Sequence, residues 1–480
     1  MNCNLPPLTR RSWFEDSGNP EDNSMNRNAF AMNWLRRADF YRLPLVVAWH
    51  AANCFQPTKN LRTTIHLLAV MITCAFPAVR ADLLVPMDLT QTDHLKAYGI
   101  AYHALELGVD VEWLLNYRGG SFLMAGDDEL RRRMLLDGVR FEEIDAGAQA
   151  AIYQEIEEQN MQAIVLEKAP RIAVYVPPAT VEEPWDDAVI LALDYAGIPF
   201  DRIYDEEVQA GRLGEYDWLH VHHEDFTGQY GKFYAGFHGA AWYQNRKTQL
   251  EERARAAGYQ KVWQHKHATV EAIKDYVSRG GFLFAMCSGA DSYDIALAAG
   301  DVDIVDAIND GDPADPQAQA KLDFGRCLAF QNFTLEMNPF VYEFSDIDMS
   351  NYAQLRGPAA DYFVLFDFSA KEDPVPAMLT QCHVNMVNGF MGQTTSFKRD
   401  LLKPSTLVLA EVPGTEEVRY IHGNFGQGTF TFFGGHDPED YEHRVGDPPT
   451  RLELHKNSPG YRLILNNVLF PAAQKQERKT

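Results

Sequence analysis

The sequence predicts an α/β protein, with a doubly wound parallel sheet preceded by a small α/β module. Short apolar runs alternate with amphipathic helical segments between residues 171 and 299, which is the pattern of β-α-β units. These runs are rich in Val, Ile, Leu and Phe, as strands covered on both faces are. A sharp strand-to-helix turn at Cys287 lies where such sheets bind ligands, at the carboxyl end of a strand.

The composition describes an ordinary globular chain of 480 residues, with 46% hydrophobic and 23% charged residues. This length suits two or three domains, or one large α/β domain with an added module. The formal net charge of −24 argues against a general nucleic-acid or anionic-membrane surface. The chain has no internal repeat and no apolar run long enough to span a bilayer.

Residues 1–81 are expected to form a leader outside the fold. Basic residues, an apolar run and then small residues follow one another within 59–81, which is the order of a secretory signal peptide. Because such a signal begins near the start of a protein, we expect translation to begin downstream of the first methionine, at Met25 or Met32. We therefore expect export after cleavage near Ala81. A cytoplasmic protein with a hydrophobic leader helix is the alternative.

Three of the six cysteines lie in the leader, which leaves Cys287, Cys327 and Cys382. An odd number of cysteines in an exported chain leaves at least one free thiol. One arrangement is a bridge between Cys327 and Cys382 with Cys287 free.

The region 82–166 is predicted to be the small α/β module. Asp93-His94 and the turn 116–120 are expected to act as a helix cap and a loop rather than as a ligand site. The expected elements are a strand at 83–87, a helix at 93–108, a strand at 109–117, a helix at 127–137 and a polar linking helix at 154–162.

The region 167–480 is predicted to hold the doubly wound sheet. Its acidic stretch 301–349 shows no regular pattern. The expected strands are 171–176, 200–204, 216–222, 282–286, 363–366 and 406–410, with a hairpin formed by 419–422 and 428–433. The expected helices are 185–196, 261–279, a segment that begins after Cys287, and 458–469.

Cys287 stands at the centre of a small-x-nucleophile-x-Gly sequence, Ala285-Met-Cys-Ser-Gly289. Between a strand and a helix, this arrangement predicts a nucleophile elbow that raises the thiol above the sheet. The positive end of the following helix is expected to lower the pKa of the thiol. The competing interpretation is a buried structural cysteine.

A second polar cluster ends the predicted strand 216–222. His220, His222 and His223, with nearby carboxylates, suit a divalent metal. Alternatively, the loop from Gly228 to Gly231 offers N–H groups as an oxyanion hole beside the thiol. In a third interpretation the histidines only form hydrogen bonds within a crowded loop.

The expected partner of the thiol is His436, which lies on a glycine-rich turn after the hairpin. It would accept the thiol proton, while Asp437 or Glu439 would orient its ring. His383 and His422 are the rival bases, and both lie in less distinctive surroundings.

Together, Ala285-Met-Cys287-Ser-Gly289 and Gly434-Gly-His436-Asp-Pro-Glu439 resemble the class I glutamine amidotransferase-like superfamily over residues 168–473. The resemblance implies a flavodoxin-like sheet, with Cys287 as nucleophile, His436 as base and Glu439 as third member. Three features differ from the family pattern. Ala285 replaces the usual first glycine, Glu439 follows His436 by three residues rather than two, and a long insertion separates Cys287 from His436.

The runs 222–233 and 434–441 more closely resemble bacterial chains labelled asparagine synthetase B. Genuine glutamine-dependent asparagine synthetases resemble an N-terminal-nucleophile glutaminase joined to an ATP pyrophosphatase domain. Here Asn2 precedes Cys3, and the run 288–292 is one residue shorter than the pyrophosphatase loop. These differences argue against the asparagine synthetase mechanism for this chain.

The sequence thus predicts a cysteine-dependent amidohydrolase that acts on a small-molecule amide through a thioester, without a cofactor or a bound metal. Its oligomeric state is left open. The residues expected to contact the oxyanion or the substrate are Ser288, Gly289, Gly228, Gly231 and His223. The alternatives are a non-catalytic binding module on the same fold, an asparagine synthetase-type role, and a metallohydrolase at His220, His222 and His223.

Overall fold

The structure is a computed structural model that describes residues 81–178, 183, 185–351, 355, 357, 361–373, 380–441 and 444–474. The chain divides into two compact units between Val79 and Arg80, and all of these residues lie in the second. The predicted leader, with its signal-like segment, lies outside the described residues except for Ala81. Within the described ranges, no helix combines the length and apolarity needed to cross a membrane.

The N-terminal module is a five-stranded sheet with the order β4-β1-β3-β2-β5, and every neighbouring pair is antiparallel. Each helix begins at an aspartate whose side chain accepts backbone N–H groups of the first turn. The strands are β1 (Asp82–Val85), β2 (Val111–Leu115), β3 (Ser121–Met124), β4 (Glu142–Ile144) and β5 (Gln162–Leu166). The helices are α4 (His94–Glu106), α5 (Asp128–Asp137) and α6 (Ala146–Glu158), with a 3-10 turn, η2, at Tyr117–Gly119.

Two predictions for this module need correction. The expected linking helix 154–162 is instead the end of α6 followed by the start of β5. The strands β3 and β4 were not expected, because they have only four and three residues and show no extended alternation.

The large sheet has ten strands among the described residues, and five of them are parallel. Their spatial order is β7-β6-β8-β9-β15, which is 2-1-3-4-5 along the chain, a common order of doubly wound sheets. Their bounds are β6 (Ile172–Tyr175), β7 (Asp201–Ile203), β8 (Trp218–Val221), β9 (Phe282–Met286) and β15 (Gly428–Phe433).

The remaining strands extend this sheet in antiparallel fashion, so the sheet is mixed rather than parallel throughout. The predicted hairpin is confirmed as β14 and β15, whose pairing runs from Tyr420 opposite Phe433 to Phe425 opposite Gly428. Beyond it lie β13, β10 and β11, while β12 pairs with β14. The bounds are β10 (Tyr362–Leu365), β11 (Met386–Asn388), β12 (Phe397–Lys398), β13 (Leu407–Glu411) and β14 (Glu417–Phe425).

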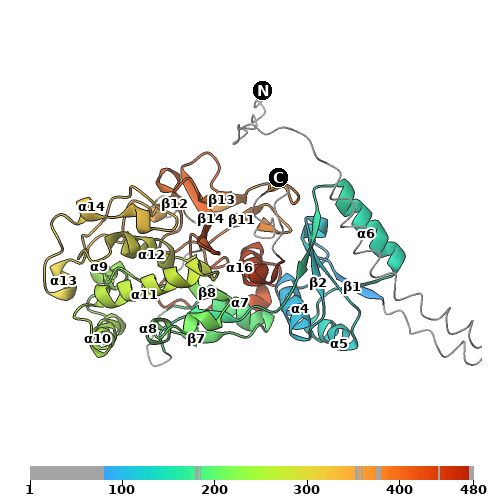
Figure 1. The fold of residues 1–480 in the computed structure, drawn as a ribbon, viewed down its shortest axis with the longest axis horizontal. Coiled ribbons are helices and arrows are strands. Elements are labelled where there is room, and N and C mark those ends of the chain that lie inside the picture. The colour runs from blue at the N-terminus through green and yellow to red at the C-terminus, as the bar shows by residue number, and fades with distance from the viewer. Residues whose placement is uncertain are drawn as a thin grey trace, which may run out of the picture. The chain divides into compact units, whose positions relative to one another are not determined.

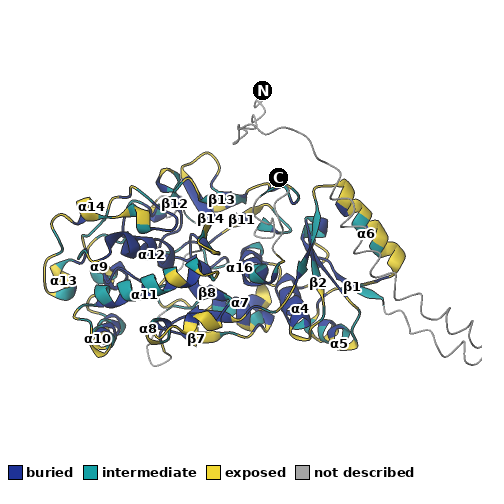
Figure 2. Ribbon diagram, in the orientation of Figure 1, coloured by how far each residue is buried: buried dark blue, intermediate teal, exposed yellow. Residues whose placement is uncertain are grey.

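Helices cover both faces of the parallel strands (Figure 1). One core joins α7 and α16 to Trp218 and Phe284, and the other joins α11 and α12 to Leu219 and Leu283. Figure 2 shows α12 buried along its length, in agreement with the burial of all its residues. The helices are α7 (Ala188–Ala196), α8 (Asp205–Gln209), α9 (Tyr234–Phe237), α10 (Ala241–Ala256), α11 (Val262–Ser278), α12 (Ser288–Ala299), α13 (Ala307–Asp310), α14 (Ala318–Lys321) and α16 (Pro459–Leu469).

The small module and the large sheet share one core, because α4 packs against α7 and α16. A side chain at Gly99 would strike the carbonyl oxygen of Ala196, so glycine allows the close approach of α4 and α7. The guanidinium of Arg462 on α16 is fully buried and donates to the Tyr98 hydroxyl at 2.9 Å and the Met87 carbonyl at 2.8 Å. The α/β class predicted from the sequence is therefore confirmed in its coarse form.

Candidate functional site

The backbone of Cys287 has the conformation of an elbow between β9 and α12. Its φ of 52° and ψ of −142° place a non-glycine residue in a sparsely populated region, at a cost of about 1–3 kcal/mol. A Cβ at Gly289 would lie 2.6 Å from the carbonyl oxygen of His222, so the turn needs glycine there. The Gly289 N–H donates to the same carbonyl at 2.7 Å, which anchors the elbow to the end of β8.

The thiol of Cys287 is only 2% exposed. Burial raises its pKa to about 12, with smaller contributions in the same direction from Asp291 and Asp348 and an opposing one from Ser288. This direction is opposite to the lowering expected from the helix terminus. The reason is that loss of hydration disfavours the thiolate more than the first N–H groups of α12 favour it.

Two buried carboxyl groups, those of Asp291 and Asp348, lie near enough to the Cys287 thiol to raise its pKa. Burial raises the pKa of Asp291 and of Asp348. Thr394 joins them, since its hydroxyl donates to Asp291 at 3.0 Å and its backbone N–H donates to Asp348 at 3.2 Å. Sequence reasoning missed both residues, because one reads as a helix residue and the other lies in the irregular stretch 301–349.

His436 lies next to the elbow through the backbone but not through its ring. The Gly435 carbonyl accepts the N–H of Cys287 at 3.1 Å. The buried ring places Nε2 at 3.0 Å from the Asp186 carbonyl oxygen and at 3.0 Å from Nε2 of His223. Among the described residues, no hydrogen bond joins the Cys287 thiol to His436. The structure therefore brings the two backbones together and points the imidazole towards other histidines.

The two carboxylates proposed to orient His436 have other partners. Asp437 accepts the Tyr461 hydroxyl at 2.6 Å and the Glu439 N–H at 2.7 Å. The carboxylate of Glu439 lies 3.0 Å from Nδ1 of His455. In the part of the chain that is described, neither carboxylate forms a hydrogen bond with the His436 ring. Both stabilise the turn that carries the histidine.

The N–H groups proposed for an oxyanion hole are partly occupied. The Gly231 N–H donates to the carboxylate of Asp225 at 2.9 Å, and the Gly289 N–H donates to β8 as described above. Gly228 has a φ of 80° and packs against Trp263. The Ser288 N–H interacts with the thiol itself. Ser288 is thus the proposed donor whose N–H contacts the Cys287 thiol directly.

Four histidines form a cluster above the carboxyl ends of β8 and β15. The His222 and His223 rings stack at 3.9 Å with an interplanar angle of 10°, and both lie against His436. His220 faces the neighbouring strand, where its Nδ1 lies 3.0 Å from the Phe284 carbonyl oxygen. His222, His223 and His436 place one ring nitrogen each within 4.8 Å of the others.

An aspartate pair at the start of α7 completes this cluster. The Asp186 carbonyl oxygen lies 2.7 Å from Nε2 of His223, and Asp187 lies beside His220 and His222. Burial would raise the pKa of Asp187, but the two histidines outweigh it and hold that pKa well below its usual value. Sequence reasoning treated this segment only as the beginning of a helix. Its place after β6, on the same sheet edge as β8, was the available signal.

The rival bases and the other cysteines lie in different surroundings. His422 lies 2.9 Å from the Thr431 hydroxyl, and burial lowers its pKa to about 3. His383 stacks on His94 at 4.2 Å. Cys327 and Cys382 are both free thiols, so the bridge between them considered from the sequence is not formed.

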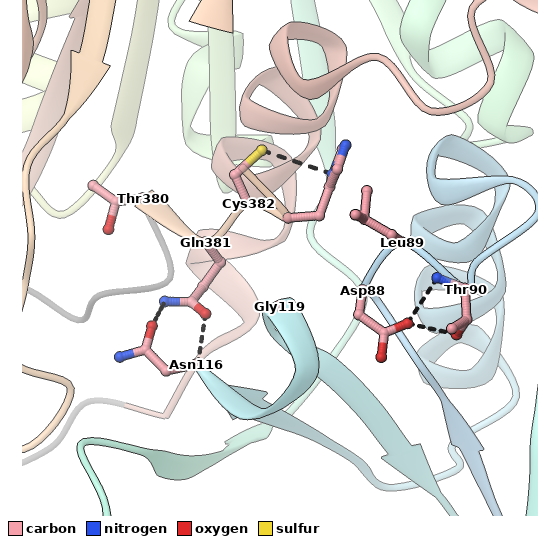
Figure 3. A pocket seen from close by; sticks show the side chains of 9 residues that line it. Asp88, Leu89, Thr90, Asn116, Gly119, Thr380, Gln381 and Cys382 are labelled. Carbon is pink, nitrogen blue, oxygen red and sulfur yellow. Dashed lines mark hydrogen bonds between the residues drawn. The ribbon is translucent and has the colours of Figure 1, made fainter. Parts of the chain in front are cut away.

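A cavity of about 600 Å³ lies between the small module and the segment 380–383 (Figure 3). The turn 116–120, expected to be only a loop, contributes Asn116 and Gly119 to it. Asn116 and Gln381 are joined there through their side-chain amides at 3.0 Å. The cavity shares no lining residue with the elbow. Its lining is Asp88, Leu89, Thr90, Asn116, Gly119, Thr380, Gln381, Cys382 and His383.

Comparisons with known proteins give distant structural likenesses only. No family model and no curated protein matches the sequence. The cytoplasmic protein STM3548 from Salmonella typhimurium is similar over 64% of this chain and 100% of its own, with 13% identity and a TM-score of 0.32. The cytoplasmic protein STM1381 from Salmonella typhimurium LT2 is similar over 60% of this chain and 89% of its own, with 15% identity and a TM-score of 0.29. A GH42 β-galactosidase, Gan42B, is similar over 56% of this chain and 28% of its own, with 10% identity and a TM-score of 0.23. Similarities of this size assign no activity to the chain.

Proposed function

We propose that this chain is a cysteine-dependent amidohydrolase of the class I glutamine amidotransferase-like type, with a flavodoxin-like sheet. The observation that carries the proposal is the backbone of Cys287, a non-glycine residue with positive φ between a buried strand and a buried helix. Strained conformations of this kind persist where the surrounding structure enforces them, and they concentrate at functional sites. A merely structural cysteine has no need of such a turn.

The position of His436 supports the same proposal. β15 is the parallel neighbour of β9, and both strands end at the same edge of the sheet. Cys287 and the turn that carries His436 follow these strands directly. The hydrogen bond from the Cys287 N–H to the Gly435 carbonyl holds the two turns together. Nucleophile and base therefore leave the sheet side by side, as a thiol–imidazole pair requires.

The proposed reaction begins with a protonated thiol, because its pKa is raised to about 12. His436 removes that proton as the sulfur attacks the carboxamide carbon, which requires the ring to exchange its contact with His223 for one with the thiol. The Ser288 N–H stabilises the oxyanion. The C–N bond then breaks, His436 returns the proton to the departing amine, and a thioester remains. Water hydrolyses the thioester to the acid and regenerates the thiol.

The proposed substrates are small carboxamides, with glutamine-like amides first because the resemblance points to them. The competing function is a binding module whose thiol is chemically silent. The two differ in one respect that an experiment reaches directly, namely whether Cys287 forms a covalent acyl intermediate.

The test measures ammonia release from glutamine, asparagine and a panel of peptide amides. We expect Cys287→Ala and His436→Gln each to lower the rate by at least ~10³-fold, as loss of a nucleophile or base does. Cys327→Ala is the matched control, since this cysteine is also buried but lies outside the elbow. It should retain the rate. Mass spectrometry after acid quenching should find the acyl group on Cys287. Undiminished release by Cys287→Ala, or a folded wild type that neither releases ammonia nor becomes acylated, contradicts the proposal.

A further inference from the structure

A second cluster of polar side chains lies beside the elbow and does not include His436. Asp187 at the start of α7 and His220 and His222 on and after β8 place one potential ligand atom each within 4.8 Å of the others. Their side chains are 9%, 0% and 1% exposed. Such burial removes water as the ordinary partner of these groups, so their charges and lone pairs must be balanced by the protein or by a bound ion.

The separations within this group are longer than those of an ordinary hydrogen bond. Nε2 of His220 lies 3.6 Å from Oδ1 of Asp187, and Nδ1 of His222 lies 3.4 Å from the same oxygen. An N–H···O hydrogen bond joins atoms about 2.7–3.2 Å apart. Two ligands of one tetrahedral zinc ion, each about 2.0–2.1 Å from the metal, are separated by about 3.3–3.4 Å. The observed spacing therefore fits shared coordination better than direct pairing.

Neighbouring hydrogen bonds fix the orientation of the His220 ring and of the Asp187 carboxylate. The Phe284 carbonyl can only accept, so Nδ1 of His220 donates to it, and Nε2, which faces the Asp187 carboxylate, is the ring atom left to coordinate a cation. Asp187 Oδ1 accepts the N–H groups of Val189 and Ile190, at 2.8 and 3.0 Å, which holds the carboxylate in place. Among the described residues, Oδ2 of Asp187 has no hydrogen-bond partner although it is buried. A histidine that binds a metal through one ring nitrogen usually donates a hydrogen bond from its other ring nitrogen, often to a backbone carbonyl.

We propose that Asp187, His220 and His222 bind one divalent transition-metal cation of the zinc class. Two imidazoles and one carboxylate form a donor set that zinc accepts. The ligand set differs from the alternative considered from the sequence, because Asp187 takes the place of His223, whose Nε2 lies against the Asp186 carbonyl and His436. The proposal of a bound cation also replaces the sequence-based expectation that the protein holds no metal.

The proposed cation would link α7 to β8 and, through β8, to the elbow. The carbonyl oxygen of His222 accepts the Gly289 N–H, so a ligand residue directly supports the first turn of α12. The proposal is independent of the thiol reaction, because none of the three ligands is assigned a chemical step there. Metal content and amidohydrolase activity are therefore separate measurements, and either can fail alone.

The test uses the full chain and Zn²⁺ as the probe. Purified protein is stripped with a chelator, dialysed, and titrated with Zn²⁺ while bound metal is measured by mass spectrometry of the elements. We expect one Zn²⁺ per chain, and a Tm that rises on rebinding because the ion binds the folded state. His220→Gln and Asp187→Asn should each weaken binding by at least ~100-fold. His422→Gln is the matched control, since this histidine is equally buried in the same sheet and contacts Thr431 instead.

Three outcomes overturn the proposal. In the first, the stripped wild type takes up no stoichiometric Zn²⁺ and its Tm does not change on addition. In the second, His220→Gln and Asp187→Asn bind Zn²⁺ as the wild type does. In the third, His422→Gln loses the metal to the same extent as they do. The wild-type titration does not depend on any variant, so it decides the question even where a substitution prevents folding.

Discussion

At the scale of single residues, the backbone of Cys287 and the surroundings of its thiol have opposite consequences. The positive φ projects the side chain as a nucleophile elbow does. Burial and two nearby carboxyl groups keep the thiol protonated. In the proposed reaction, proton removal would therefore accompany the attack on the substrate rather than precede it. For this reason the proposed reaction needs a base such as His436, which follows the neighbouring strand β15.

The pH dependence of alkylation should report this protonation state. Only the thiolate reacts, and the pKa of Cys287 is raised from an ordinary value of 9 to about 12. The rate of iodoacetamide labelling should therefore be very low at pH 7 and should increase about tenfold per pH unit beyond pH 9, where an ordinary cysteine has levelled off. Peptide-resolved mass spectrometry of the native protein measures it, with the urea-denatured protein as control. A native rate that levels off near neutral pH would show that the thiolate is stabilised instead.

The sequence singles out Cys287 and His436 as candidates because each directly follows an apolar run and stands among small residues. It does not identify Asp187, since an aspartate before a helix is ordinarily a cap, and this one is a cap as well. It does not identify Asp348 either, because that residue lies in a segment without periodicity. Both aspartates reach the site through tertiary packing, and a linear pattern carries no information about which distant strand end a cap or loop will meet.

At the scale of elements, long and strongly periodic segments are predicted well. The helices α4, α7, α11 and α16 and the hairpin β14–β15 begin and end within a few residues of their expected bounds. Short strands are missed. β4 has three residues, two of them acidic, and its partners across the sheet rather than its own side chains decide its conformation. In the antiparallel extension of the large sheet, β10, β13 and the hairpin match predicted strands, whereas β11 and β12, with three and two residues, are missed for the same reason.

The elbow should tolerate no side chain at Gly289. A Cβ there would lie 2.6 Å from the His222 carbonyl oxygen, so α12 would have to move away from β8. We expect Gly289→Ala to lower the free energy of unfolding by about 1–3 kcal/mol, measured by urea denaturation. Gly214→Ala is the control, because nothing lies within 4 Å of its added Cβ. It should stay within about 0.5 kcal/mol of the wild type. Equal stability of the two variants would mean that the close approach is not required.

At the scale of the whole molecule, the two sheets behave as parts of one hydrophobic core. The cluster of buried residues runs without interruption from β1 and α4 through α7 to α16. Arg462 lies in this junction, and it donates to groups of the small module on one side and approaches His383 at 3.3 Å on the other. The small module is therefore expected to unfold together with the large sheet rather than independently.

Arg462→Met should test this coupling. The substitution keeps most of the side-chain volume but leaves the Met87 carbonyl without this donor, at a cost of about 1–3 kcal/mol for each buried polar group left unsatisfied. We expect a lower urea midpoint and a transition that spreads into two steps, whereas the wild type unfolds in one. Fluorescence and far-UV circular dichroism should coincide for the wild type and diverge for the variant. Arg132→Met, at an exposed position on α5, should change neither property. A single unshifted transition in Arg462→Met would refute the coupling.

The parallel pairing of β9 with β15 also governs when the site comes into existence during synthesis. Phe282 pairs with Thr429 and Met286 with Phe433, so the strand that carries the elbow waits for a neighbour made much later. Until then one edge of β9 has no partner, and an open edge of this kind invites pairing with other chains. Closing so long a loop is also slow. A nascent chain that ends before residue 436 therefore lacks the proposed base, and only a longer chain brings Cys287, His436 and a closed edge of β9 together.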